Sequence, residues 1–64
     1  MNSIQIIRLL KSDGWIVKTQ SGSHIQFVHP NKPGKVTVAF HGKQEIPPGT
    51  LNRILKQAGL KENS

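Results

Sequence analysis

The chain of 64 residues contains no cysteine, which excludes disulfide bonds, thiolate zinc sites and cysteine nucleophiles. Acidic residues are scarce as well, and three Asp and Glu in all leave little scope for paired carboxylates. No two of the three histidines have the i, i+4 spacing of a helical metal site, and phosphate-binding glycine loops and serine triads are missing. We therefore expect a protein without a metal ion or cofactor, and nothing points to an oxidising compartment.

Long hydrophobic runs are also missing. The apolar opening stretch, residues 4–10, is interrupted by Gln5 and Arg8 and is too short to span a bilayer. It also lacks the basic leader and the small-residue cleavage site of a signal peptide. We therefore expect residues 1–64 to form one cytoplasmic domain with a modest core and no membrane contact.

Positive charge, by contrast, is abundant. Nine Lys and Arg against three acids give a net charge of +6. Such a charge attracts nucleic acid, acidic membranes or an acidic protein, and no basic amphipathic helix of the membrane-surface kind accompanies it. Because many small domains are basic without binding nucleic acid, charge alone does not decide between these partners.

The first forty residues have the pattern of one helix and three strands. Ser3 is a favourable N-cap for a helix over about residues 3–12, whose apolar face ends ahead of Gly14. The β-branched and aromatic residues that follow form three runs, separated by a turn at 21–23 and a polar loop at 30–35. These runs predict strands at residues 15–20, 24–29 and 36–40.

A second helix is predicted after Pro47 and Pro48, because proline is tolerated in the first turn of a helix. Its clearest signal is a set of apolar residues at i, i+3, i+4 and i+7, namely Leu51, Ile54, Leu55 and Ala58. Gly59 and Leu60 close this helix. The chain is therefore expected to be an α+β protein of order α-β-β-β-α, with a three-stranded antiparallel sheet and both helices on one face.

Strand alternation predicts which side chains lie on the other, open face of the sheet. Ile25 and Phe27 are apolar and should face the helices, which turns His24 and Gln26 outward. The same rule sorts the remaining strand residues. The outward set also contains Ile16, Lys18, Gln20, Val28, Thr37 and Ala39, and the inward set contains Trp15, Val17, Thr19, Val36, Val38 and Phe40.

The lengths of the two connections predict the register of the hairpins. A three-residue turn puts Gln20 opposite His24 and Lys18 opposite Gln26. A six-residue loop between the second and third strands puts His24 opposite His41, so that two imidazoles stand side by side. We therefore expect a polar, mildly basic open face around His24.

Several short motifs follow one another along the chain. They are Gly22-Ser23-His24, Phe27-Val28-His29-Pro30, His41-Gly42 before Glu45-Ile46, Pro48-Gly49-Thr50-Leu51 and Ile54-Leu55-Lys56-Gln57-Ala58-Gly59-Leu60. Gly-Ser-His alone would be weak evidence, but in this order the motifs resemble the HicA toxins over nearly the whole chain. The resemblance implies a fold similar to a double-stranded RNA-binding domain and cleavage of mRNA in a type II toxin–antitoxin system.

The same resemblance implies a partner and a catalytic residue. The partner is a HicB antitoxin, which neutralises the toxin by covering its active site. The catalytic histidine of the family corresponds to His24 here. Ile25 stands where many relatives have a second histidine, and its inward parity leaves the open face unchanged.

His24 is suited to act as a general base on RNA, which carries its own nucleophile in the 2′-hydroxyl beside the scissile phosphate. An imidazole with an ordinary pKa of about 6.5 is mostly neutral near pH 7 yet easily protonated. The reaction also needs donors for the phosphate oxygens and an acid for the leaving 5′-oxygen. The candidates for these supporting roles are Gly22, Ser23, Lys18, Gln26, His41, Lys32, Lys35 and Lys43.

Each candidate also has an ordinary structural explanation. Gly22 and Ser23 are typical turn residues, His41 precedes a loop glycine, and exposed lysines are most often only solvated. Trp15 and His29 have inward parity and are expected to be structural. Three functions therefore stay open: a ribonuclease toxin, a non-catalytic RNA-binding module, and an adaptor for an acidic protein.

Overall fold

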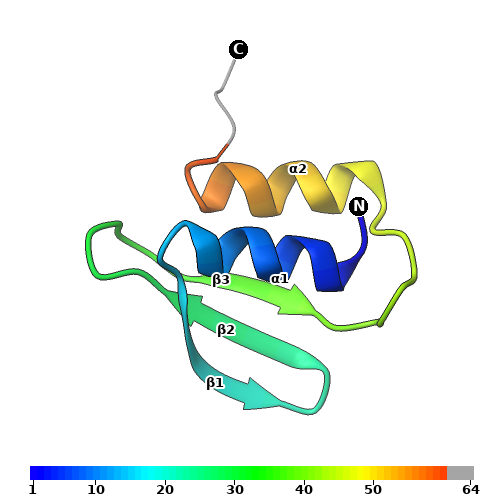
Figure 1. The fold of residues 1–64 in the computed structure, drawn as a ribbon, viewed down its shortest axis with the longest axis horizontal. Helices are drawn as coiled ribbons and strands as arrows, with labels where there is room; N and C mark the ends of the chain where they lie inside the picture. Colours follow the sequence, from blue (N-terminus) through cyan, green and yellow to red (C-terminus); the bar gives the residue numbers. More distant parts are fainter. Residues whose placement is uncertain (61–64) are drawn as a thin grey trace.

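Five elements of secondary structure follow in the order expected from the sequence (Figure 1). A computed structural model describes residues 1–60, and residues 61–64, the end of the expected domain, lie outside the described residues. The elements are α1 (Ser3–Ser12), β1 (Ile16–Ser21), β2 (His24–Val28), β3 (Val36–Ala39) and α2 (Pro48–Gln57). The strands form one antiparallel sheet in the order β1-β2-β3. The predicted α+β class is confirmed.

Helix α1 has the predicted bounds but a different N-cap. The Asn2 side chain accepts the backbone N–H of Gln5 at 2.9 Å, and Gln5 Oε1 accepts the N–H of Asn2 at 2.9 Å. This reciprocal pair is a capping box, and it makes Ser3 the first helical residue. The buried Ser3 hydroxyl instead accepts the His41 N–H and donates to the Gly42 carbonyl. The prediction of Ser3 as the N-cap is therefore wrong, because the loop after β3 occupies its hydroxyl.

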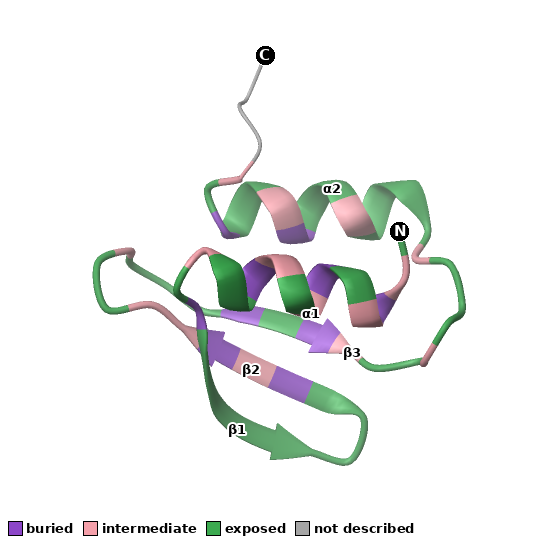
Figure 2. Ribbon diagram, in the orientation of Figure 1, coloured by how far each residue is buried: buried purple, intermediate pink, exposed green. Residues whose placement is uncertain are grey.

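A single core joins both helices to one face of the sheet (Figure 2). Its buried hydrophobic members are Ile6, Leu10, Trp15, Ile25, Phe27, Val36, Val38, Ile54 and Ala58. Buried residues of β2 and β3 alternate with more exposed ones, so the helices cover one face and leave the other open. The inward positions predicted for Ile25, Phe27, Val36 and Val38 are confirmed, because all four are buried. Phe40 was expected in the same inward set, but it follows the end of β3 and is 41% exposed.

Strand β1 lies largely outside this core (Figure 2). All of its residues are exposed, including Val17, which is 43% exposed although it pairs with the buried Phe27. Both helices contact the sheet through β3, at the far edge from β1. The inward residue predicted just ahead of β1, Trp15, is 2% exposed and belongs to the core.

The turn between β1 and β2 is one residue shorter than predicted. Ser21 pairs with His24, so residues 22–23 alone form the turn. Gln20 pairs with Ile25 and therefore lies on the side of the sheet that faces the helices. The predictions of a turn at 21–23, of Gln20 opposite His24 and of Gln20 on the open face are wrong for this reason.

A β-bulge in β1 compensates for the short turn. The pairing steps from Val17 with Phe27 to Thr19 with Gln26, which leaves Lys18 as the additional residue. In a bulge, two residues of one strand oppose one residue of its partner, so Lys18 and Thr19 share the face of Gln26. Lys18 thus lies on the face predicted for it, whereas Thr19, which was expected inside, faces outward.

The second hairpin is shifted by two residues from the predicted register. His24 pairs with Ala39, and the last pair, Phe27 with Val36, leaves eight residues in the connection. The prediction of His24 opposite His41 is therefore wrong. A shift of two residues keeps every side chain on its own face, so the inward and outward sets of β3 are unchanged.

His29 explains why the connection is longer than expected. Its Nε2 donates to the Asp13 carbonyl at 2.7 Å, and its Nδ1 accepts the Asn31 N–H at 3.0 Å. The ring also packs edge-on against Trp15, with 5.2 Å between the ring centroids. A Cβ on Gly14 would lie 2.8 Å from His29 Nε2, so glycine is needed there. These contacts take His29 out of the ladder into a structural position.

Candidate active site

His24 begins β2 and lies on the open face of the sheet, directly after the turn. Its side chain is exposed and makes no hydrogen bond or ion pair with any other residue between 1 and 60. Its cross-strand neighbours are Ser21 on β1 and Ala39 on β3. Such neighbours have Cβ atoms about 5 Å away, and both side chains are too small to cover the imidazole. His24 is therefore open to a ligand from solvent.

The turn of Gly22 and Ser23 holds His24 at the end of the sheet. Gly22 has a φ of 58°, whereas none of the described non-glycine residues, Ser23 included, has a positive φ. This combination fits a type II′ turn, which has glycine in its first central position and matches the twist of the strands. The Ser23 carbonyl accepts the Phe40 N–H at 2.7 Å, which fastens the turn to the residue after β3.

Replacing Gly22 with alanine is expected to lower the free energy of unfolding by about 1–2 kcal/mol. A Cβ at this position meets no atom within 4 Å, so the cost comes from the φ of 58° and not from a clash. Gly49→Ala is the matched control, because Gly49 has no positive φ, lies in α2 and has equally open surroundings. Urea unfolding should show a loss for Gly22→Ala only, and equal effects of the two variants would contradict this explanation.

Polar side chains extend from His24 along the open face. Ser21 stands beside it, and Thr19 and Gln26 come next, with Thr19 Oγ1 donating to Gln26 Oε1 at 3.5 Å. Strand alternation missed Ser21 and Thr19. Glycine is typical of the first position of a two-residue hairpin turn, so Gly22 could have predicted that Ser21 pairs with His24. No local sequence pattern predicts the bulge that turns Thr19 to the open face.

A hollow of about 340 Å³ is lined in part by Ala39, the cross-strand neighbour of His24, but not by His24 itself. Its polar lining includes His41, Gln44 and Thr50, from the loop after β3 and the first turn of α2. His41 therefore belongs to this hollow and does not stand beside His24. The hollow therefore has hydroxyl, amide and imidazole groups in its lining, and Ala39 is the residue that connects it to His24.

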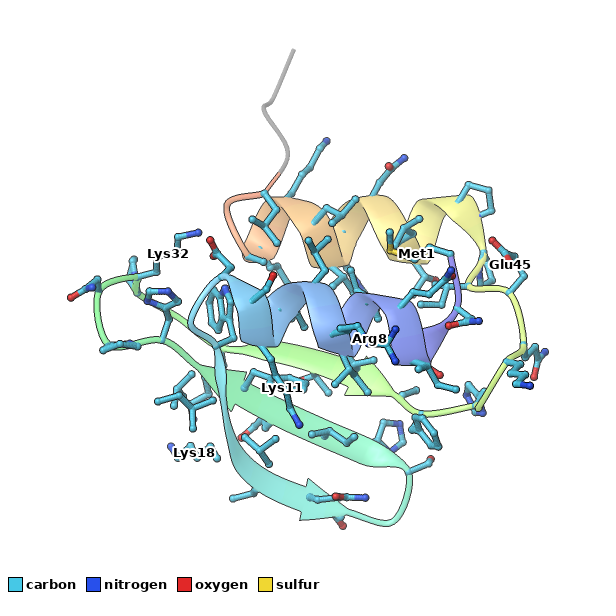
Figure 3. The ribbon with its side chains drawn as sticks, viewed as in Figure 1. Met1, Arg8, Lys11, Lys18, Lys32 and Glu45 are labelled. Atoms are coloured by element: carbon cyan, nitrogen blue, oxygen red, sulfur yellow. The ribbon has the colours of Figure 1, made fainter. Side chains whose placement is uncertain are left out.

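The N-terminal end holds the loop that lines this hollow. The Ile46 N–H donates to the Met1 carbonyl at 2.9 Å, and Asn2 and Glu45 form an isolated β-bridge. The N-terminal ammonium pairs with the Glu45 carboxylate (Figure 3). Together with the Ser3 hydroxyl, these contacts fix the loop to the start of α1.

Two of the candidate lysines, Lys18 and Lys32, lie in clearly different places (Figure 3). Lys18 and Lys35 are in contact with each other. The Lys32 ammonium donates to Asp13 Oδ2 at 2.5 Å and to the Ala58 carbonyl at 2.9 Å, and so links the ends of α1 and α2. Lys43 is exposed in the loop after β3. Lys32 thus has a structural function, and its contact with phosphate stays a prediction.

The Asp13–Lys32 pair predicts a pH dependence of stability. The hydrogen bond from Lys32 lowers the pKa of Asp13 below its ordinary value of 3.8, and the Trp15 indole adds a further donor at 3.2 Å. Because the folded pKa lies below the unfolded pKa, the stabilisation is complete above pH 3.8 and is lost as the pH falls through the lower folded value.

Chemical unfolding between pH 5 and about pH 2 measures this loss, a window set by the linkage between pKa and stability. Lys32→Met should flatten the acid branch of the stability curve, because the pKa of Asp13 then returns towards 3.8. Lys56→Met, an exposed lysine of α2 with no acidic partner among residues 1–60, should leave the acid branch unchanged. An identical acid branch in the native protein and in Lys32→Met would refute the assignment.

Two negative findings apply to residues 1–60. No three His, Asp or Glu side chains in this range lie close enough together to hold a metal ion. No helix in this range has the length and apolar character needed to cross a bilayer. The groups that surround His24 are hydroxyls and amides, with the ammonium groups of Lys18 and Lys35 on the same face.

Comparison with known protein families gives one relevant match. The model described as "HicA toxin of bacterial toxin-antitoxin" matches residues 4–60 of the 64-residue chain. This range contains all three strands, α2 and every candidate residue of the site. No curated protein matches the chain.

Proposed function

The chain belongs to the HicA family, the toxins of bacterial toxin–antitoxin systems, and from this premise we propose that it is an endoribonuclease that cleaves mRNA with His24 as the general base. The reaction needs no metal ion, because the substrate supplies its own nucleophile. The observation that carries the proposal is the exposure of His24 on the open face, between the small side chains of Ser21 and Ala39.

In the proposed reaction, His24 takes the proton of the ribose 2′-hydroxyl. The 2′-oxygen then attacks the adjacent phosphorus, and the bond from phosphorus to the 5′-oxygen breaks. The leaving 5′-oxygen takes up a proton, and the products end in a 2′,3′-cyclic phosphate and a 5′-hydroxyl. In this proposal the N–H groups of the turn at Gly22 and Ser23, together with the Ser23 hydroxyl, donate to the phosphate oxygens, and the exposure of both residues supports this role.

Inhibition by a partner follows from the same exposure. His24 needs no movement of the described residues to become accessible, so the toxin has to be neutralised by something that covers the open face. We assign this role to a HicB antitoxin, in a hetero-oligomer formed in the cytoplasm, where mRNA is found. The positive charge of +6 favours an acidic covering surface as well as RNA.

The test is cleavage of single-stranded RNA by the purified chain in excess chelator, with analysis of the product ends. We expect cleavage to continue in chelator and to leave 2′,3′-cyclic phosphate ends. A 2′-deoxynucleotide at the cleaved position should block the reaction, because it removes the nucleophile. Ends with a 3′-hydroxyl, or a requirement for added metal, would overturn the mechanism, and tight binding without cleavage would favour a non-catalytic RNA-binding module.

A further inference from the structure

Two lysines from opposite edges of the sheet reach the same place on its open face. Lys18 is the additional residue of the β1 bulge and opposes Gln26 together with Thr19. Lys35 comes directly before β3 and has the outward parity of Thr37, which pairs with Gln26 from the other side. Strand β2 lies between them. Their side chains therefore cross over β2 from both edges.

The two side chains lie close enough to interact, although both carry ammonium groups at neutral pH. An ammonium group only donates, so the two groups cannot stabilise each other by a hydrogen bond. The nearby Lys35 lowers the pKa of Lys18 from its ordinary value of 10.5, because it disfavours a second positive charge beside its own. The contact brings like charges together and calls for an anion between them.

No carboxylate in the described part of the chain supplies that anion. The two acidic residues between 1 and 60 are Asp13, which pairs with Lys32, and Glu45, which pairs with the N-terminal ammonium. The sheet backbone holds the two lysines in place, since the bulge fixes Lys18 and the register of β3 fixes Lys35. The pair is therefore a pre-formed position for an external anion.

We propose that Lys18 and Lys35 together bind one phosphate group of single-stranded RNA, at a subsite separate from the phosphate cleaved at His24. Lys18 lies near the end of β2 that is opposite to the turn (Figure 3), and Lys35 comes directly before the start of β3 at the same end of the sheet. Three residues of β2, about 10 Å, separate the pair from His24 on the same face. An RNA strand that runs along β2 thus presents one phosphate to His24 and a neighbouring phosphate to the lysines, and the proposal rests on the function proposed above.

RNA fits this pair better than an acidic protein does. The two ammonium groups converge on one point, as a single tetrahedral anion with several acceptor oxygens requires. When a phosphate binds between them, both lysines donate and their mutual repulsion is relieved.

The experiment measures binding of short single-stranded RNAs to the His24→Ala protein, which leaves the strand uncut. Each RNA carries one neutral methylphosphonate linkage, moved along the strand one position at a time. We expect one position to weaken binding on the order of 10- to 100-fold, the effect of one lost charged contact. Adding Lys18→Met and Lys35→Met should remove the sensitivity at that position alone and lower the salt slope of binding by about one.

Lys56→Met in the same background is the matched control, because it removes one exposed charge from α2, away from the open face. It should keep the methylphosphonate pattern of the His24→Ala protein. The double lysine variant should unfold at the same temperature as its parent or higher, since it removes a repulsion, and this excludes misfolding as the cause of weaker binding.

Three results would overturn the subsite. They are an unchanged methylphosphonate pattern in the double lysine variant, an equal loss with Lys56→Met, and RNA binding by the double lysine variant as tight as that of its parent. Each of these leaves cleavage at His24 intact and so is distinct from failure of the proposed function. Conversely, a native protein that shows the predicted pattern but never cuts RNA supports the phosphate subsite and refutes the ribonuclease.

Discussion

Replacing His24 with alanine is expected to lower the rate of RNA cleavage by about 10²- to 10⁴-fold, the usual contribution of a general base. His24→Gln should lose as much, because an amide keeps the hydrogen-bonding ability of the imidazole but does not take up the 2′-hydroxyl proton. Single-turnover cleavage of a defined RNA measures the rate. Binding of an uncleavable RNA should change little, since the loss falls on the chemical step.

The variant should also stay folded. The His24 side chain is exposed and makes no hydrogen bond within residues 1–60, so its removal should change the free energy of unfolding by no more than about 0.5 kcal/mol. Gln57→Ala is the control, because it removes an exposed polar side chain of α2 that has no place in the site, and it should keep most of the cleavage rate. Cleavage by His24→Ala at the native rate would remove His24 from the mechanism.

The helices and the inward faces of β2 and β3 could be predicted because they depend on local patterns. Helix α1 begins and ends at the predicted residues, and Gly59 closes α2 with a φ of 69°. The Leu60 N–H returns to the Leu55 carbonyl at 2.8 Å, as the Gly59-Leu60 pair predicted. Each of these features needs only residues within a few positions of one another.

The neighbours of His24 could not be predicted, because register depends on contacts between distant parts of the chain. The short turn moved Ser21 opposite His24, and the bulge returned Lys18 to the open face. The shorter turn and the bulge each shift the pairing of β1 by one residue, and at Lys18 the two shifts cancel, so Lys18 lies on the predicted face. Gln20 lies between the turn and the bulge, is shifted by the turn alone and therefore lies on the opposite face from the predicted one. Alternation counts residues along one strand and has no means of detecting an additional residue.

The roles of His29 and Lys32 show the same limit. Sequence parity placed His29 correctly inside but did not reveal that it binds the Asp13 carbonyl, sixteen residues away. Lys32 looked like a free loop lysine, yet it pairs with the Asp13 carboxylate. Sequence alone therefore does not separate a lysine that the fold pairs with a carboxylate, as at Lys32, from lysines without an acidic partner among residues 1–60, such as Lys18 and Lys35.

Replacing Phe27 with alanine is expected to lower the free energy of unfolding by about 3–5 kcal/mol. Phe27 is fully buried at the centre of the sheet, where it pairs with Val17 and Val36. A natural domain is stable by only about 5–15 kcal/mol, and a 64-residue chain without disulfides has a small core, so this loss removes a large share of the total. Urea unfolding followed by the fluorescence of Trp15, the single tryptophan, measures it.

Two further variants separate the core from the site. Val17→Ala, on the same side of the sheet but 43% exposed, should cost far less than Phe27→Ala, and equal costs would contradict the placement of the core over β2 and β3. Phe27→Leu keeps more apolar volume and provides a folded variant if Phe27→Ala does not fold. Because Phe27 and His24 lie on opposite faces of β2, the cleavage rate per folded molecule of Phe27→Leu should equal that of the native protein. A lower rate per folded molecule would mean that the core side of β2 also shapes the open face.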